Sequence, residues 1–170
     1  MNIILTGMRG TGKTTLGQQI AQALKWNWLD VDHEFERTNK TTVHEFVKEK
    51  GWDAFRQKEK EIALKAALQN HTVISTGGGT LMDPQSAKAL KNSGIIILLV
   101  CDLDILKNYL RSDTQRPSLT GIDPLEELEQ VWNARKDRYH ALADLIHDTS
   151  KWPSHQLLLD KLREHPKLKS

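Results

Sequence analysis

A glycine-rich stretch near the N-terminus has the residue types and spacing of a phosphate-binding loop. Residues 7–15 read Gly-Met-Arg-Gly-Thr-Gly-Lys-Thr-Thr and fit the pattern G-x-x-x-x-G-K-[ST]. Glycines allow backbone N–H groups to turn inward around an anion. Lys13 can then reach the β- and γ-phosphates of a nucleotide, and the Thr14 hydroxyl can bind Mg²⁺. We therefore expect nucleotide binding here, and the alternative is a glycine-rich turn without a ligand.

Two carboxylates, Asp30 and Asp32, stand two residues apart at the end of an apolar stretch. We interpret residues 26–32 as a strand, on which this spacing places both side chains on one face. In phosphoryl transfer one acid can orient Mg²⁺ and its waters, while another accepts the proton of the acceptor hydroxyl. The alternative is that Asp32 only caps the helix that follows. The residues alone leave both interpretations open.

Two arginines occupy apolar faces of expected helices. Arg56 and Glu59 lie on or beside the apolar face of a helix that starts at Trp52, where a charge requires a partner. Arg135 fills the one gap in a second apolar stripe, and Arg138 lies off that stripe and is expected at the surface. The simpler alternatives are an ion pair of Arg56 with Glu59 and snorkelling of Arg135. Beside a phosphate loop, the two arginines indicate a site for a carboxylate or phosphate on a second substrate.

Two loops carry further candidates. Gly77–Gly79 follows a short strand, and because three glycines cost backbone entropy, close approach of a ligand is a reason for them. A tight turn is the alternative. Arg116 lies in the polar segment 112–123, which is expected to be a loop. A mobile arginine there could close over the phosphates and stabilise transferred charge, although it could also be an ordinary exposed arginine.

Apolar runs alternate with helical patterns along the whole chain. Strands are expected at about 2–6, 26–32, 72–75, 95–100 and 145–146. Helices are expected at about 13–25, near 43–47, at 52–68 and at 124–141. Three more are expected: one that begins at 84, one that ends at about 111 and a terminal one that ends at about 164. This alternation predicts an α/β fold with helices on both faces of a parallel sheet, a three-layer α/β/α arrangement. Ligands then bind beyond the C-terminal ends of the strands.

Length and composition limit the classes of protein to which this chain can belong. The 170 residues suit a single domain over 1–170, and a net charge of +2 provides no strong basic field for a nucleic acid. Cys101 is the only cysteine, which excludes an intrachain disulfide and fits a reducing compartment. No apolar stretch approaches membrane-spanning length, and the N-terminus lacks a signal-peptide layout. We expect a cytoplasmic protein that binds neither nucleic acid nor membrane.

Taken together, these motifs resemble the shikimate kinases, which belong to the nucleoside-monophosphate-kinase-like branch of P-loop proteins. The resemblance extends to at least Asp148 and rests on several blocks in a fixed order. These blocks are Gly7–Thr15, Leu29–Asp32, Gly51 through Phe55-Arg56 to Glu59, Thr76–Gly79, Arg116-Pro117, and Arg135 with Tyr139. The resemblance implies a parallel sheet of five strands in the order 2-3-1-4-5, with substrate-binding helices at about 32–60 and a mobile lid at about 112–123.

The implied activity is ATP-dependent phosphorylation of the 3-hydroxyl of shikimate, a step in making aromatic amino acids. The resemblance assigns the phosphates to Lys13 and Thr14 and the metal Mg²⁺ to Thr14 and Asp30, with Asp30 acting through water. Arg116 would belong to the lid and engage the ATP phosphates. The expected cofactor-binding residues are Gly10, Thr11, Gly12, Lys13, Thr14, Thr15 and Arg116.

On the acceptor side, Asp32 would bind the substrate hydroxyls and act as the base. Arg56 and Arg135 would hold the shikimate carboxylate, with a backbone contact at Gly78. The expected catalytic residues are Lys13, Asp32 and Arg116, and the expected partners of a monomeric enzyme are ATP and shikimate.

The chain departs from the family pattern at three places beside the substrate pocket or in the lid. The family often has Gly-Glu where this chain has Gly-Trp at 51–52, and Arg-Pro-Leu-Leu where it has Arg-Pro-Ser-Leu at 116–119. A common glycine is replaced by the Lys-Thr-Thr stretch at 40–42. Two alternatives stay open: a kinase of another small hydroxy acid such as gluconate, and a nucleotide-binding regulator without turnover. The arginine pair and the triple glycine favour shikimate over gluconate.

Overall fold

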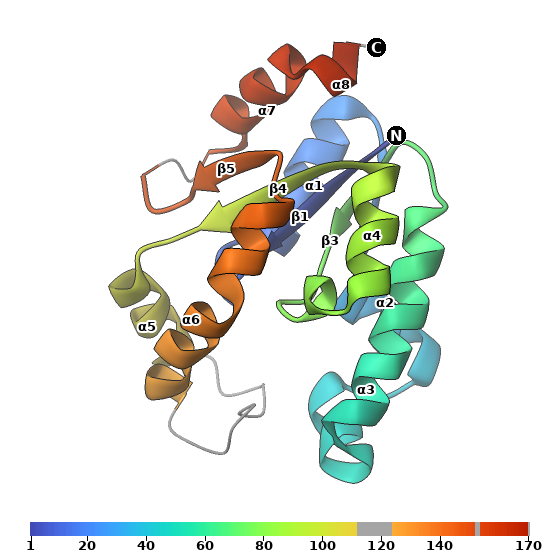
Figure 1. Ribbon diagram of the computed structural model, residues 1–170, viewed down its shortest axis with the longest axis vertical. Coiled ribbons are helices and arrows are strands. Elements are labelled where there is room, and N and C mark those ends of the chain that lie inside the picture. The colour runs from blue at the N-terminus through green and yellow to red at the C-terminus, as the bar shows by residue number, and fades with distance from the viewer. Residues whose placement is uncertain (112–123, 152–153, 170) are drawn as a thin grey trace.

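One parallel sheet of five strands forms the centre of the molecule (Figure 1). The computed structural model describes residues 1–111, 124–151 and 154–169. The strands are β1 (Asn2–Gly7), β2 (Asn27–Asp30), β3 (Thr72–Ser75), β4 (Gly94–Val100) and β5 (Leu145–Asp148). They lie side by side in the order β2-β3-β1-β4-β5, and each neighbouring pair is parallel, which confirms the expected sheet. Because β1 lies in the middle, the loop that follows it opens at the centre of the C-terminal edge, where such folds bind ligands.

Helices cover both faces of this sheet and confirm the three-layer arrangement (Figure 1). One face is covered by α1 (Lys13–Leu24) and α7 (His155–Glu164). The opposite face is covered by α2 (Val31–Asn39), α3 (Val43–Ala67) and α4 (Pro84–Ser93). The helices α5 (Leu103–Arg111) and α6 (Pro124–Leu142) pack together beside β4. Two short segments, the 3₁₀ turn η1 (Thr80–Met82) and α8 (Pro166–Lys169), complete the elements of the described residues.

The central strands are apolar on both faces because helices cover both. Neighbouring strands are in register, so side chains of one face stand in rows across the sheet. The row facing α2–α4 includes Ile4, Ile74 and Ile96, and the row facing α1 and α7 includes Ile3, Val73 and Ile95. All six side chains are fully buried. The prediction of a strand at 95–100 that is buried on both faces is thereby confirmed.

The stretch predicted as a strand over 26–32 is divided between two elements. β2 ends at Asp30 and α2 begins at Val31, so Asp30 is the N-cap of a helix. Its Oδ1 accepts hydrogen bonds from the backbone N–H groups of Asp32, at 3.0 Å, and His33, at 3.2 Å. The strand stops there because this carboxylate satisfies N–H groups of the first helical turn. The expectation that Asp30 and Asp32 share a strand face was wrong, and so was the alternative that Asp32 is the cap.

Helix α3 consists of two segments that meet at Gly51. Thr42 begins the first segment with a capping box, in which its side chain and that of Glu45 each accept a backbone N–H of the other residue. Gly51 has φ 84° and ψ 168°, a conformation that favours glycine, and it interrupts the helix. The two segments expected from the sequence therefore form one kinked element, and the second segment carries Arg56 and Glu59.

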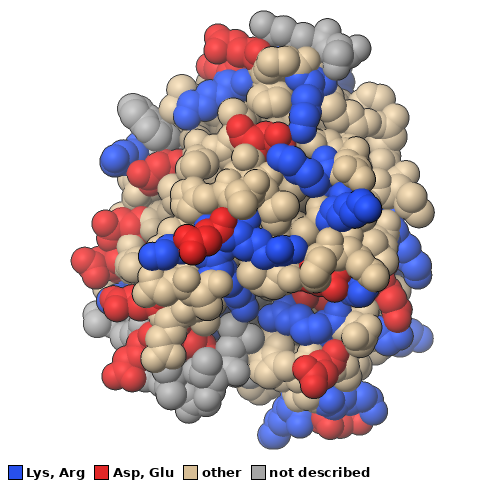
Figure 2. Space-filling view, in the orientation of Figure 1, with Lys and Arg blue, Asp and Glu red and all other residues tan. Residues whose placement is uncertain are grey.

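The surface mixes both signs of charge. On the face drawn in Figure 2, acidic and basic side chains are interspersed. Within the described residues, no helix has the length and hydropathy that crossing a membrane would require. The lid expected at about 112–123, together with Arg116, lies outside the part of the chain that the structure describes.

Candidate active site

The loop between β1 and α1 turns through three glycines with positive φ. These angles are 141° at Gly7, 82° at Gly10 and 89° at Gly12. A Cβ atom at Gly7 would lie only 2.3 Å from the carbonyl oxygen of Leu99, so glycine is also required there by space. Gly12 is the N-cap of α1 and provides no side-chain cap, and no acidic residue lies in the first turn. The N–H groups of this helix end are therefore available to an anion.

Lys13 reaches back across this loop. Its Nζ donates to the carbonyl oxygens of Gly7, at 3.0 Å, and Met8, at 2.8 Å. The buried Thr11 hydroxyl also donates to the Met8 oxygen, at 2.8 Å, so this side chain acts within the loop. Thr15, on the first turn of α1, is exposed. The ammonium group thus lies over the nest of the loop, where phosphate oxygens could replace carbonyl oxygens as its acceptors.

The hydroxyl of Thr14 and the carboxylate of Asp30 meet beside the loop. Thr14 Oγ1 donates to Asp30 Oδ2 at 2.7 Å, while the other oxygen of that carboxylate caps α2. Hydroxyl and carboxylate oxygens are the hard ligands that Mg²⁺ prefers. No cluster of three or more His, Cys, Asp or Glu side chains able to hold a metal occurs among the described residues. Mg²⁺ commonly takes one or two protein oxygens and completes its shell with water and phosphate.

Ser75, at the end of β3, fixes the first turn of α1 to the sheet. Its Oγ donates to the carbonyl oxygen of Lys13 at 3.0 Å and accepts from Trp28 Nε1 at 3.2 Å. Gly17 makes room for this contact, since a Cβ there would lie 2.4 Å from Ser75 Oγ. Sequence reasoning did not identify Ser75, although a polar residue at the C-terminal end of a short apolar strand was an available signal.

The glycines of the segment 77–79 make room for side chains of the protein itself. A Cβ at Gly77 would lie 2.5 Å from Glu59 Oε1 and 3.1 Å from Asp32 Oδ1, and one at Gly79 would lie 2.5 Å from Arg56 Cζ. None of the three glycines has a positive φ, so they do not mark an unusual backbone turn. The nearest groups to these glycines within the chain are predicted functional side chains, and the close approach of a ligand stays a prediction.

Arg56 and Glu59 form an ion pair on the second segment of α3. Arg56 Nη1 lies 2.6 Å from Glu59 Oε2, and Glu59 Oε1 accepts from Thr80 Oγ1 at 2.7 Å. The side chain of Glu59 is 3% exposed and that of Arg56 is 32% exposed. Burial raises the pKa of the Glu59 carboxyl, and the nearby Arg56 charge and the two hydrogen bonds oppose this rise. The expected ion pair is present, and it leaves part of the guanidinium accessible.

Helix α6 approaches the glycine segment from the opposite side. A Cβ at Gly78 would lie 3.2 Å from Arg135 Nη1, and the Tyr139 hydroxyl donates to the Gly78 carbonyl oxygen. Burial raises the pKa of the fully buried Tyr139 hydroxyl, which therefore remains a donor at neutral pH. Arg138 was expected at the surface, but it is half-buried and its Nε donates to the carbonyl oxygen of Leu81 at 2.6 Å. Sequence periodicity missed this bond because its acceptor belongs to a distant turn.

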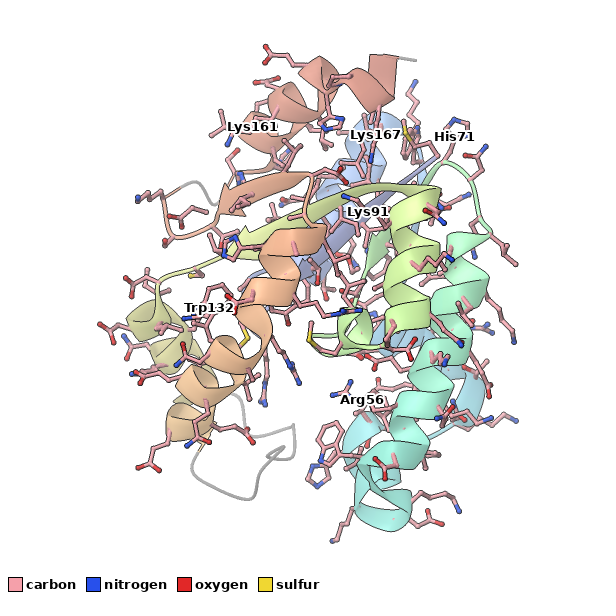
Figure 3. The ribbon with its side chains drawn as sticks, viewed as in Figure 1. Arg56, His71, Lys91, Trp132, Lys161 and Lys167 are labelled. Atoms are coloured by element: carbon pink, nitrogen blue, oxygen red, sulfur yellow. The ribbon has the colours of Figure 1, made fainter. Side chains whose placement is uncertain are left out.

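A cavity of about 270 Å³ brings the two predicted arginines together. Arg56 enters from α3 and Arg135 from α6, and Figure 3 shows Arg56 on the side of α3 that faces α6. The polar lining of the cavity also includes Glu59, Lys60, Thr80 and Asp83. Asp32 does not line this cavity and lies at the inner end of the glycine segment, beside Gly77. Two guanidinium groups that line one cavity from different helices are groups able to pair with a small carboxylate or phosphate.

Comparisons with known proteins agree with this geometry. A family model described as "Shikimate kinase" matches residues 9–164. "Shikimate kinase 2" of Pectobacterium atrosepticum is 37% identical over 154 residues, which are 89% of this chain and 88% of that protein. "Shikimate kinase 2" of Photorhabdus laumondii is 37% identical over 147 residues, which are 85% and 84% of the two chains. The solved shikimate kinase from Acinetobacter baumannii in complex with shikimate superposes with a TM-score of 0.89 at 28% identity, over 95% of this chain and 90% of that one.

Proposed function

Since the chain belongs to the shikimate kinase family and is an ATP-dependent kinase, we propose that it uses the site described above to transfer the γ-phosphoryl group of ATP to the 3-hydroxyl of shikimate. The observation that carries this proposal is the pair Arg56 and Arg135, which line one cavity beyond the phosphate loop. A donor site and a site for an anionic acceptor lie at the same edge of the sheet, as a two-substrate transfer requires.

The donor half binds phosphate through the loop and Lys13. The uncapped N-terminus of α1 directs N–H groups at the β- and γ-phosphates, and Lys13 exchanges its carbonyl acceptors for phosphate oxygens. The transferred phosphoryl group carries its charge on peripheral oxygens, so positioned positive groups lower the barrier. Arg116 completes this set as a lid residue in our proposal. Gly10, Gly12 and Thr15 serve as backbone or first-turn contacts to the nucleotide.

Thr14 and Asp30 are the residues that would hold Mg²⁺, Thr14 by its hydroxyl and Asp30 through water. Their mutual bond of 2.7 Å places both oxygens next to the loop. When bound, Mg²⁺ neutralises charge on the β- and γ-phosphates. The Asp30 carboxylate is also held by two backbone N–H groups, which fix its orientation for this role.

The acceptor half orients shikimate by its carboxylate and activates its hydroxyl. Arg56 and Arg135 hold the carboxylate, and the backbone at Gly78 contacts the ring substituents. Asp32 lies beside Gly77 and, in this proposal, accepts the proton of the 3-hydroxyl as the oxygen attacks phosphorus. Because Asp32 is 9% exposed, few waters compete for its carboxylate.

A coupled assay of ADP release tests this function with shikimate, gluconate and nucleoside monophosphates as acceptors. Of these acceptors, we expect only shikimate to be turned over. Phosphorus NMR of the product should show a phosphate monoester at the 3-oxygen. Turnover with gluconate instead would assign the site to another hydroxy acid. Binding of ATP without turnover of any acceptor would favour a regulator. Both outcomes would overturn the proposal.

We also propose that the enzyme acts as a monomer in the cytoplasm, without nucleic-acid or membrane partners. The supporting observation is that one chain supplies both halves of the described site. Sedimentation equilibrium with and without ATP checks the monomer, and a dimer dissociation constant below the assay concentration would contradict it.

A further inference from the structure

The guanidinium group of Arg56 lies in a corner formed by two aromatic rings. Its Cζ is 5.2 Å from the ring centroid of Trp52 and 5.3 Å from that of Phe55. The two rings lie 5.8 Å apart at an interplanar angle of 80°, so they form two walls that meet at nearly a right angle. Both distances fall within the range in which a cation is attracted to the face of a ring.

Trp52 reaches Arg56 because of its place directly after the kink in α3. Gly51 interrupts the helix, and the segment that begins at Trp52 places residues 52, 55, 56 and 59 on one side. Trp52 is half-buried and packs against the core cluster under α3, while Phe55 is buried within that cluster. Packing against the core therefore holds the indole ring of Trp52 in place, and the ring can restrain the Arg56 guanidinium that lies over it.

The other sides of the guanidinium are also occupied. Glu59 holds Nη1 at 2.6 Å, and the backbone of Gly79 lies so close that a Cβ there would reach 2.5 Å from Cζ. Trp52 and Phe55 do not line the acceptor cavity, whereas Arg56, Glu59 and Gly79 do. The remaining accessible side of Arg56 faces that cavity, and Figure 3 shows the labelled side chain pointing away from α3 toward α6.

We propose that Trp52 is a positioning residue, which holds the Arg56 guanidinium in the orientation that receives the acceptor's carboxylate. The inference rests on the proposed function only for its kinetic consequence, since the restraint itself is made by contacts within the chain. Glu59 fixes one nitrogen, but an ion pair at a single nitrogen leaves the plane of the group free to rotate. The backbone of Gly79 covers one face of the group, and the rings of Trp52 and Phe55 limit its rotation away from that backbone. Without the indole, part of the binding free energy of the carboxylate is spent on ordering Arg56.

Kinetics of Trp52→Leu and Trp52→Phe test this role. The leucine keeps an apolar residue but removes the ring, and we expect the KM for shikimate to rise about fivefold, with kcat and the KM for ATP nearly unchanged. Phenylalanine restores a ring face, so Trp52→Phe should recover most of the loss. Trp26→Leu is the matched control, because Trp26 packs on the opposite face of the sheet, against His71, and does not contact the site.

A second measurement needs neither substrate nor turnover. The Nε–H resonance of Arg56, assigned by its loss in Arg56→Lys, should lie upfield because of the ring currents of two aromatic faces. It should move downfield in Trp52→Leu and stay in place in Trp26→Leu. An unmoved resonance, or an unchanged KM for shikimate in Trp52→Leu, would overturn the positioning role. If the wild-type protein fails to phosphorylate shikimate while the resonance still moves, the proposed function fails and the restraint of Arg56 by Trp52 stands.

Discussion

The guanidinium group of Arg56 lies flat against the backbone of Gly79. A Cβ atom at this glycine would come within 2.5 Å of Cζ, 2.5 Å of Nη1 and 2.6 Å of Nη2, so the whole plane of the group occupies the space that a side chain would need. The backbone of the glycine segment thus packs against one face of the Arg56 guanidinium. This relationship explains why a residue type that weakens backbone order follows β3.

Gly79→Ala should displace Arg56 without unfolding the protein. The added methyl group must push the guanidinium away from its position between Glu59 and the cavity. We expect the KM for shikimate to rise about tenfold or more, as a charge-assisted contact is lost, while the KM for ATP changes little. Steady-state kinetics with each substrate varied in turn measures both.

Gly17→Ala is a matched control for this change. It also brings a Cβ within 2.4 Å of a polar side-chain atom, Ser75 Oγ, but on the face of the sheet that α1 covers. It should lower stability and leave the KM for shikimate unchanged. Equal rises of the KM for shikimate in both variants would show that general loosening of the fold, rather than displacement of Arg56, causes the effect.

Arg135→Ala should weaken shikimate binding severely and leave ATP binding nearly intact. The carboxylate loses a charge-assisted partner worth about 1.5–3 kcal/mol, which corresponds to roughly 10- to 150-fold in affinity. Isothermal titration of each ligand separates the two effects. A similar loss for both ligands would indicate a folding defect instead, and a thermal unfolding scan of the variant distinguishes that case.

Asp32→Asn should reduce turnover strongly while the fold is retained. The amide cannot accept the proton of the hydroxyl, and a positioned general base contributes about 10²–10⁴ to the rate. Asp32 lies in the first turn of α2, whose N-cap is Asp30, so the helix keeps its cap. Near-normal kcat would remove Asp32 as the base, and a rise confined to the KM for shikimate would leave it only a positioning role.

The stability of the protein should fall in acid through Asp144, between α6 and β5. Burial raises the pKa of this carboxyl, but the backbone N–H of Ile96 and the ammonium groups of Lys91 and Lys167 outweigh it, so the pKa lies below the usual 3.8. Ile96 N lies 2.9 Å from Oδ2, and the two lysine Nζ atoms lie 2.9 Å and 3.0 Å from Oδ1. The Asp144 carboxyl holds its proton more weakly in the folded state than in the unfolded state. The stabilisation by Asp144 is therefore fully present above pH 3.8, and it is lost as the pH falls through the lower pKa of the folded state.

Asp144→Asn tests this linkage. Urea unfolding at several pH values between about 7 and 3 should show that the variant is less stable than the wild type at neutral pH and that the two converge in acid. Parallel stability profiles would assign the acid sensitivity to other carboxyls.

Much of the fold could be predicted from local sequence patterns, because the residues that form each pattern lie within a few positions of one another. The alternation of strands and helices and the phosphate loop at 7–15 are of this kind, and the structure confirms both. The boundary at Asp30 was misplaced because a strand and a helix N-terminus were both compatible with the same run of residues. The outcome depends on which backbone N–H groups that carboxylate reaches.

The sequence by itself determined the family, the glycine loop and the candidate residues for an anionic acceptor, because these are properties of residue type and spacing along one element. Only the tertiary structure decided which atoms meet. It placed Arg56 against Gly79, Ser75 under the first turn of α1, and Arg138 on the carbonyl oxygen of Leu81. These contacts join segments from 23 to 62 residues apart in the chain, whose distances are fixed by packing of the sheet and its helices and not by any local preference.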